Sequence, residues 1–480
     1  MTTDGFSTVS TRTVCEKARS AFGDLVIDKR RLPASKLTGK GIPAYVAEWV
    51  LSEIVPGEGP LTIEEGQRLL AWARQKMPST EEGPVLRKDI ALGSVVKVLT
   101  FVEADVRLKK DKEAETFAKF PLIGIEQAQI PRSILDQFPE LLKQGMWGIA
   151  TIEGGKLGTL LASFKPMQST VDLSLYKEVR REFSTEEWMA LLINSIGLDP
   201  LHLTVEQQLL MLGRLLPLAQ QNMHLIELAP KGTGKSFLYE NLSPKVRLVS
   251  SGSISPAVLF VNNATGQWGV LARFKVVVLD EVQTVRLSNT SEIVGGLKGY
   301  LANGKLTRGG KLETGSDCSL VLLANIELNE NFEPVRLSLV EELPEPFRET
   351  AFLDRFRGIL PGWKLPKLEA GSFSKSLGLK ADYFADVLCA LRDDLEFDQN
   401  VSARVRLLGP NAYKRNEDSV RTIATGYAKL LFPHGDYSPG DLEEFCVRPA
   451  LEMRQLIWEE LQRADREYLK YGSTLEAKVD

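Results

Sequence analysis

One stretch in the middle of the chain restricts the fold more than any other, 225-LIELAPKGTGKSFLYE-240. An apolar run is followed there by a glycine-rich turn and then by the start of a helix. Apart from its first position, the turn matches the phosphate-loop pattern G-x-x-x-x-G-K-[ST], which joins a strand to a helix. The stretch therefore predicts an α/β core, a parallel sheet with flanking helices.

The glycine-rich turn carries the residue types that bind a nucleoside triphosphate. Its glycines allow positive φ angles and the close backbone approach by which amide N–H groups cradle phosphates. We expect Lys235 to contact the β- and γ-phosphates and the Ser236 hydroxyl to bind Mg²⁺. Ala229 replaces the first glycine of the pattern, where an ordinary φ suffices, so we expect the loop to bind ATP. The candidate ATP-binding residues of the loop are Pro230, Lys231, Gly232, Thr233, Gly234, Lys235 and Ser236.

Two later apolar runs end in polar residues, 276-VVVLDE-281 and 320-LVLLAN-325. In the first we expect Asp280 to hold Mg²⁺ together with Ser236, and Glu281 to polarise the attacking water as a catalytic residue. Helix capping by the two acids is the structural alternative. In the second we expect Asn325 to orient the same water, the sensor 1 role; the alternative for Asn325 is an ordinary turn residue.

The segment 351-AFLDRFRG-358 places Arg355 directly after an apolar run. We expect Arg355 to act as an arginine finger, which stabilises transition-state charge and is commonly supplied by a neighbouring subunit. A local ion pair with Asp354 is the alternative, and Arg357 is a competing candidate. The predicted catalytic residues are therefore Lys235, Glu281, Asn325 and Arg355.

A predicted helix, 414-KRNEDSVRTIATGYAKLL-431, supplies the last motif. Arg415 or Arg421 is expected to contact the γ-phosphate of ATP as sensor 2, and because they point in different directions only one is expected to do so. Five such motifs in this order are typical of an AAA+ ATPase, and because the finger works between subunits we expect a ring, usually of six.

The rest of the chain supports four predicted parts. A helical N-terminal region is predicted for 1–85. A β-rich collar domain is predicted for 86–182, as a small barrel or sandwich for which an OB-like fold is one candidate. Ser184 and Glu187 form a capping box that opens the AAA+ core at 183–365. A C-terminal helical lid with a terminal helix is expected over 366–480.

Composition excludes several classes of protein. The four cysteines include no C-x-x-C pair and the chain has 3 histidines, which argues against a zinc site and fits reduced, cytoplasmic thiols. No apolar run approaches the roughly 20 residues that span a bilayer, so no membrane partner is expected. The net charge of -4 means that any DNA contact must come from a local basic lining.

Two segments resemble parts of MCM-type AAA+ motors. The stretch 264-ATGQWGV-270 resembles their short helix-2 insertion, and 303-NGKLTRGGKLE-313 resembles their presensor-1 hairpin. The resemblance implies a basic hairpin tip that faces DNA, formed here by Lys305, Arg308 and Lys311. A basic turn exposed to solvent is the alternative.

A closer resemblance, over roughly residues 20 to 465, is to the BrxL family, Lon-like AAA+ ATPases of BREX bacteriophage-defence systems. It is carried by 183-FSTEEWMALLINSIGLDP-200, 227-ELAPKGTGKS-236, 350-TAFLDRFRGILPGWKLPK-367 and 424-ATGYAKLLFPHGDY-437. It implies phage restriction by a homo-hexamer that can stack as a dodecamer, with ATP and Mg²⁺ as cofactors. The implied partners are double-stranded DNA and other BREX proteins. Two departures are Ala229 and the lack of a C-terminal Lon domain, from which we expect no protease activity.

The competing hypothesis is a protein unfoldase or remodeller that works with a separate protease or partner. Trp268-Gly269 resembles the aromatic-glycine loop that grips polypeptides, but it lies directly before the strand at 276–280, so we expect Trp268 to pack within the insertion. A scaffold that binds ATP without hydrolysing it is a third hypothesis, which Glu281 and Asn325 argue against.

Overall fold

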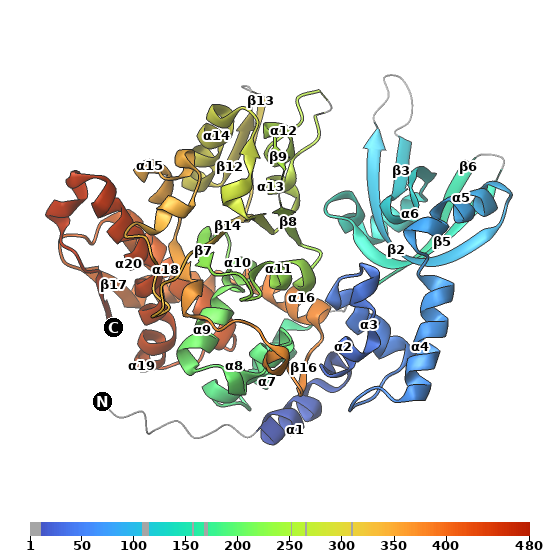
Figure 1. Cartoon of the computed structure of the whole chain (residues 1–480), viewed down its shortest axis with the longest axis horizontal. Helices are drawn as coiled ribbons and strands as arrows, with labels where there is room; N and C mark the ends of the chain where they lie inside the picture. The colour runs from blue at the N-terminus through green and yellow to red at the C-terminus, as the bar shows by residue number, and fades with distance from the viewer. Residues whose placement is uncertain are drawn as a thin grey trace. The chain divides into compact units, whose positions relative to one another are not determined.

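The structure is a computed structural model that describes residues 11–107, 115–155, 158–167, 171–250, 252–264, 266–308 and 311–480 (Figure 1). The chain divides into two compact units. Unit 1 contains Met1–Val26, Val171–Leu379 and Tyr383–Asp480, and unit 2 contains Ile27–Thr170 and Lys380–Asp382. This division differs from the four consecutive parts predicted from the sequence. Helix α1 (Thr11–Phe22) belongs to unit 1, because Phe22 packs on the rings of Tyr176 and Trp188.

Unit 1 is built on a parallel sheet with the strand order β15-β7-β14-β10-β8. The strands are β7 (Leu225–Ala229), β8 (Val246–Ser250), β10 (Val276–Asp280), β14 (Ser319–Asn325) and β15 (Gly358–Pro361). Every residue of β7, β10 and β15 is buried, as expected for a parallel sheet covered on both faces. The predicted parallel α/β core is confirmed.

Helices cover this sheet and connect its strands. They are α7 (Leu173–Arg180), α8 (Thr185–Ser195), α9 (Val205–Gly213), α10 (Leu216–Ala219), α11 (Lys235–Leu242), α12 (Pro256–Leu259), α13 (Val270–Arg273), α14 (Thr290–Asn303) and α15 (Thr350–Leu353). The predicted capping box of α8 is present: the Glu187 amide donates to Ser184 Oγ at 3.2 Å, and the Ser184 amide donates to Glu187 Oε2 at 2.8 Å. Both bonds satisfy amides that the first helical turn leaves unpaired.

Two small insertions project from the sheet region. Between α12 and α13 the chain turns back on itself through a bridge between Val261 and Trp268, and Trp268 packs against the core, as expected for a structural residue. After α14, β12 (Lys305–Arg308) pairs antiparallel with β13 (Lys311–Gly315), which confirms a hairpin at 303–313. A further parallel pair joins β9 (Ser253–Ile254), which precedes the first insertion, to β11 (Arg286–Leu287), which lies between the two insertions in sequence.

The C-terminal part of unit 1 contains helices and a small sheet. The helices are α16 (Ala381–Leu391), α17 (Glu396–Arg404), α18 (Lys414–Leu431), α19 (Pro439–Leu442) and α20 (Arg448–Ala464), and the short strand β16 covers Leu377–Leu379. The first two residues of α16 are counted with unit 2. The expectation that this part is helical to its end was wrong. β17 (Val405–Leu408) pairs antiparallel with β18 (Glu476–Val479). Alternate residues of β17 are buried, as in a strand with one face on the core. The role of this part as a lid stays a prediction.

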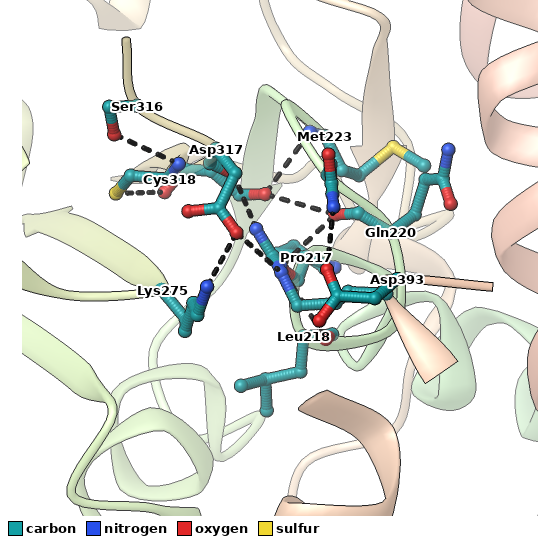
Figure 2. Close-up of polar contacts among 12 residues, drawn as sticks. Pro217, Leu218, Gln220, Met223, Lys275, Ser316, Asp317, Cys318 and Asp393 are labelled. Atoms are coloured by element: carbon teal, nitrogen blue, oxygen red, sulfur yellow. Dashed lines mark hydrogen bonds and ion pairs between the residues drawn. The ribbon is translucent and has the colours of Figure 1, made fainter. Parts of the chain in front are cut away.

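A partly buried polar network joins the C-terminal helices to the sheet region (Figure 2). Arg392, which follows α16, donates to the backbone carbonyls of Pro217, Gln220 and Asp317. The Asp317 carboxylate also accepts from Lys275 Nζ at 2.6 Å. Because Asp317 precedes β14 by two residues, these bonds hold the C-terminal helices to the amino end of that strand.

Unit 2 contains a closed barrel with the strand order β2-β3-β4-β6-β5. Its strands are β2 (Val95–Arg107), β3 (Glu115–Phe120), β4 (Ile125–Gln129), β5 (Met146–Gly155) and β6 (Gly158–Pro166), and the helices of the unit are α2 (Arg31–Ser35), α3 (Ala44–Ile54), α4 (Ile63–Lys76), α5 (Gly83–Ala91) and α6 (Arg132–Gln137). The structure thus selects the barrel over the sandwich, while the OB-like assignment stays a prediction. The barrel interior is filled by apolar side chains, among them Val102, Phe120 and Ile152.

Candidate nucleotide-binding site

The phosphate loop and the polar ends of two other strands meet at one edge of the sheet. Parallel strands place their carboxyl ends at the same edge, which is where ligands bind in open α/β sheets. Asn325 at the end of β14 is in register with Ala229 at the end of β7, and β10, which ends at Asp280, pairs with β14 on its other side. Lys235 Nζ donates to Asn325 Oδ1 at 2.8 Å. The structure therefore brings the predicted loop, Asp280 and Asn325 together.

The backbone of the loop has the conformation that its glycines allow. Gly232 has φ 90° and Gly234 has φ 75°, and Gly234 is the residue from which α11 begins. A Cβ at Gly234 would lie 2.5 Å from Leu368 Cδ1, so a side chain there is excluded by contact as well as by conformation. The first amides of α11 have no partner inside the helix, and together with the helix dipole they favour an anion.

Lys235 carries a buried positive charge without a paired carboxylate. The residue is 6% exposed, and its ammonium donates to neutral oxygens, those of Asn325, Ala229 and Pro230. Across the described parts of the chain, Lys235 forms no ion pair. Burial lowers the pKa of the Lys235 ammonium, while the more distant charges of Glu227 and Asp280 act to raise it. An ammonium in this setting fits the β- and γ-phosphates of a nucleotide.

The two acids after β10 differ in burial and in backbone conformation. Asp280 is 6% exposed and its Oδ1 accepts from the Glu281 amide at 2.9 Å. Glu281 is exposed and has φ 46° and ψ 46°, a left-handed conformation that costs free energy in a residue other than glycine. The Thr284 amide and hydroxyl both donate to the Glu281 carbonyl, at 2.7 and 2.9 Å, and so hold this conformation. Strain of this kind is typical of functional sites.

The oxygen ligands near the loop suit Mg²⁺. This ion commonly binds one or two protein oxygens and completes its shell with phosphate oxygens and water. The Asp280 carboxylate and the Ser236 hydroxyl, on β10 and on the first turn of α11, are the predicted pair. The donor set therefore fits the ion that a bound nucleotide brings.

Arg355 lies at the opposite edge of the sheet from the phosphate loop. It precedes β15, whose first residue, Gly358, is in register with Leu225 at the start of β7. The neighbouring Arg357 amide donates to the His224 carbonyl at 2.8 Å. At about 3.3 Å per residue, the six residues from His224 to Pro230 put about 20 Å between the two edges. Arg355 therefore does not reach the loop of its own chain.

The surroundings of Arg355 leave part of its guanidinium unpaired. Its Nη1 donates to the Ala351 carbonyl, and among the residues that the structure describes its buried Nε has no hydrogen-bond partner. Asp354, the alternative local partner, instead forms ion pairs with Arg415 and with Arg454 Nη2, the latter at 2.5 Å. The competing candidate Arg357 is partly buried, and this burial lowers its pKa to about 10.

The two sensor 2 candidates have separate structural partners. Arg415 pairs with Asp354, at the edge of the sheet opposite the loop. Arg421 donates from Nε and Nη2 to the Val405 carbonyl at 2.9 and 2.7 Å, and it pairs with Glu417 at 2.9 Å. The structure therefore does not bring either arginine to the phosphate loop of its own chain, and their role stays a prediction.

The three predicted DNA-facing residues all lie on the β12–β13 hairpin. Lys305 is exposed and pairs with Glu313 across the hairpin. Arg308, the last residue of β12, and Lys311, the first residue of β13, are opposite each other in the strand register. The side chains of Arg308 and Lys311 lie outside the described residues.

Sequence reasoning missed two groups that touch the phosphate loop. Arg214 and Glu227 form a buried ion pair beneath it, and the Leu368 amide donates to the Gly232 carbonyl at 2.8 Å. A signal for the first group was present, because Glu227 interrupts the apolar run of β7 and a buried carboxylate requires a partner. No local pattern distinguishes Leu368, since its contact depends on where the segment after β15 crosses the loop.

Comparison with known families gives two matches that together span most of the chain. The model described as "Lon-like protease BrxL-like, ATPase domain" matches residues 159–474. The model described as "BREX system Lon protease-like protein BrxL N-terminal" matches residues 20–153. The boundary between the two matches falls near the end of the barrel.

Individual relatives agree with the family matches. The Lon-like protease BrxL of Escherichia coli O9:H4 (strain HS) is 30% identical over 88% of this chain and 61% of its own length, and that of Bacillus cereus (strain H3081.97) is 31% identical over 88% and 63%. This chain thus spans about three fifths of the length of those relatives. A full-length MCM homologue from Methanopyrus kandleri aligns with a TM-score of 0.43 and 12% identity over 89% of this chain and 100% of that chain. Within the described ranges, no helix combines the length and the apolar character needed to cross a membrane.

Proposed function

The chain belongs to the BrxL family, and from that premise we propose that it hydrolyses ATP with Mg²⁺ as a ring that binds double-stranded DNA in BREX-type phage restriction. The observation that carries the ATPase part is the 2.8 Å bond between Lys235 of the phosphate loop and Asn325 at the end of β14, at the sheet edge where Asp280 also lies. This edge holds the residue types that phosphoryl transfer to water requires.

Each residue at the edge has a distinct proposed task. The amides of the loop and the Lys235 ammonium bind the β- and γ-phosphates, and the oxygens of Ser236 and Asp280 hold the metal ion. Glu281 orients a water molecule and takes its proton, and Asn325 moves from Lys235 to the same water. Mg²⁺, when bound, would neutralise negative charge that develops on the phosphates.

The DNA part of the proposal rests on the β12–β13 hairpin and on family membership. A basic turn between two strands presents cations to a phosphate backbone, and such contacts make binding strongly dependent on salt. The barrel of unit 2 is a second candidate surface, by analogy with small barrels that bind nucleic acid. The proposed partners are duplex DNA, further copies of this chain in a hexamer or stacked dodecamer, and other BREX proteins.

The first test measures ATP turnover by the purified protein alone, with duplex DNA and with an unfolded protein, each at two salt concentrations. Stimulation by DNA that weakens as salt rises is expected. Stimulation by the unfolded protein alone would replace the DNA-binding proposal with a protein unfoldase. A Lys235→Ala variant serves as the control, and turnover that survives this substitution would refute the proposed ATP site.

A further inference from the structure

The phosphate loop rests on a buried ion pair. Arg214, which follows α9, is 1% exposed, and Glu227 in β7 is 2% exposed. Glu227 Oε1 accepts from Arg214 Nη2 at 2.6 Å, and Glu227 Oε2 accepts from Arg214 Nε at 3.2 Å. Two parallel bonds of this kind fix the plane of the guanidinium. Because β7 leads directly into the loop, the guanidinium is fixed relative to the loop as well.

The remaining nitrogen of the guanidinium bonds the loop itself. Arg214 Nη1 donates to the Thr233 carbonyl at 2.8 Å. Thr233 is fully buried, and its hydroxyl accepts from Arg214 Nη2 at 3.4 Å and donates to the Pro230 carbonyl at 3.3 Å. The side chain of Thr233 therefore belongs to the floor of the loop, and only its backbone is available to a nucleotide.

The bond to the Thr233 carbonyl determines where the next amide points. A trans peptide is planar, so the N–H of Gly234 points opposite to the C=O of Thr233. The carbonyl faces the buried Arg214 below the loop. The Gly234 N–H therefore faces the other side of the loop, where phosphates bind. Without Arg214 the peptide would lose this constraint, since glycine tolerates rotation into other φ and ψ regions.

A second contact holds the same loop from the side. The Leu368 amide donates to the Gly232 carbonyl at 2.8 Å, and the Leu368 side chain lies against Gly234. The peptides on both sides of Thr233 are thus held by bonds to their carbonyls. Their amides stay available for a ligand.

We propose that Arg214 is a positioning residue for ATP binding, which orients the Gly234 amide toward the phosphates through its bond to the Thr233 carbonyl. Glu227 holds the Arg214 guanidinium in the plane that this bond requires. The proposal rests on the proposed ATP site. In this proposal Arg214 acts on the nucleotide only through the peptide between Thr233 and Gly234. This role is distinct from stabilising the core.

The test uses the double substitution R214M/E227Q in the full chain. Replacing both partners with neutral side chains of similar size leaves no unpaired buried charge, so the variant is expected to fold. Equilibrium binding of a fluorescent ATP analogue, the KM and kcat for ATP, and the temperature of unfolding are measured together. We expect the Kd and the KM to rise about tenfold or more, which corresponds to about 1.4 kcal/mol. Purely structural stabilisation by the pair would lower the unfolding temperature and leave the Kd unchanged.

A matched control separates a general loss of stability from a loss of loop geometry. Arg392 is also fully buried and also donates to backbone carbonyls, but at the amino end of β14. In Arg392→Met the Asp317 carboxylate keeps its partner Lys275. We expect this variant to unfold at a lower temperature and to bind the ATP analogue with the Kd of the unmodified protein.

A conservative substitution provides a second test. Arg214→Lys keeps a positive charge for Glu227, but an ammonium lacks the planar fork that bonds the carboxylate and the Thr233 carbonyl together. We expect a Kd between those of the unmodified protein and the double variant. An unchanged Kd in either folded variant would overturn the positioning role, while Lys235→Ala still abolishes binding. If Lys235→Ala also binds with unchanged affinity, the proposed ATP site itself is refuted, and the positioning role with it.

Discussion

Glu281 combines an exposed carboxylate with a left-handed backbone, directly after a buried strand. The conformation is held by two bonds from Thr284 to the Glu281 carbonyl. These bonds fix the backbone while the Glu281 side chain remains exposed. This arrangement suits a residue that must accept a proton from water in an assembled site, and it gives the predicted catalytic role of Glu281 a structural basis.

The role of Glu281 predicts the behaviour of one isosteric variant. Glu281→Gln keeps the size and the backbone of the residue but cannot take a proton, so we expect ATP to bind normally while turnover falls by about 10²- to 10⁴-fold. Binding of a fluorescent ATP analogue and steady-state phosphate release measure the two quantities. Glu240→Gln, an exposed acid near the end of α11, is the matched control and is expected to retain full turnover. Turnover that is unchanged in Glu281→Gln would remove Glu281 from catalysis.

At the scale of single residues, the sequence predicted the positions whose chemistry depends on neighbours along the chain. The glycines of the loop and the acids after β10 follow from local patterns, because a strand end fixes where the next side chains lie. Arg214 could not be predicted in this way, since its partners Glu227 and Thr233 are separated from it by 13 and 19 positions. The same limit applies to Arg415, whose ion pair with Asp354 joins residues 61 positions apart.

At the scale of elements, the strands that appear as continuous apolar runs in the sequence were predicted, whereas the two short strands near the C-terminus were not. β7, β10 and β14 are buried on both faces and stand out as continuous apolar runs. β17 and β18 expose alternate residues and cover four positions each, so neither differs clearly from a loop or a helix end in sequence. Their pairing becomes evident only when the fold brings residues 405–408 beside 476–479.

The β12–β13 hairpin is the element on which the DNA-binding proposal depends most. Substituting Lys305, Arg308 and Lys311 together with glutamate is expected to weaken duplex binding and to reduce its salt dependence by about 0.9 in log–log slope for each phosphate that is no longer neutralised. Fluorescence anisotropy of a labelled duplex over a range of salt concentrations measures both effects. The control makes the same change of charge at exposed Arg406, Lys414 and Lys470 in the C-terminal part. An unchanged slope in the hairpin variant would show that the hairpin is a solvent-exposed basic turn.

At the scale of the whole molecule, the geometry of unit 1 favours a site shared between subunits. The phosphate loop and Arg355 lie at opposite edges of one parallel sheet, and strand length alone separates these edges by about 20 Å. A finger arginine must come within hydrogen-bond distance of the transferred phosphate. A ring satisfies this requirement, because each subunit then presents the Arg355 edge to the loop edge of the next.

A mixing experiment tests the shared site directly. Arg355→Ala and Glu281→Gln are each expected to be nearly inactive, the first because removal of a finger costs about 10³- to 10⁵-fold in turnover. When the two variants are mixed before assembly, some interfaces join an intact Glu281 to an intact Arg355. With random mixing about a quarter of the interfaces are complete in this way, so we expect up to about a quarter of the unmodified turnover to return.

The control for the mixture uses two variants that damage the same side of the interface. Glu281→Gln mixed with Lys235→Ala leaves no interface with a complete loop edge, so no activity should return. If Arg355 instead acted within its own chain, the first mixture would also stay as inactive as its components. Recovery in the first mixture and none in the second would place Arg355 at the neighbouring subunit's nucleotide, because no single chain in that mixture carries both residues.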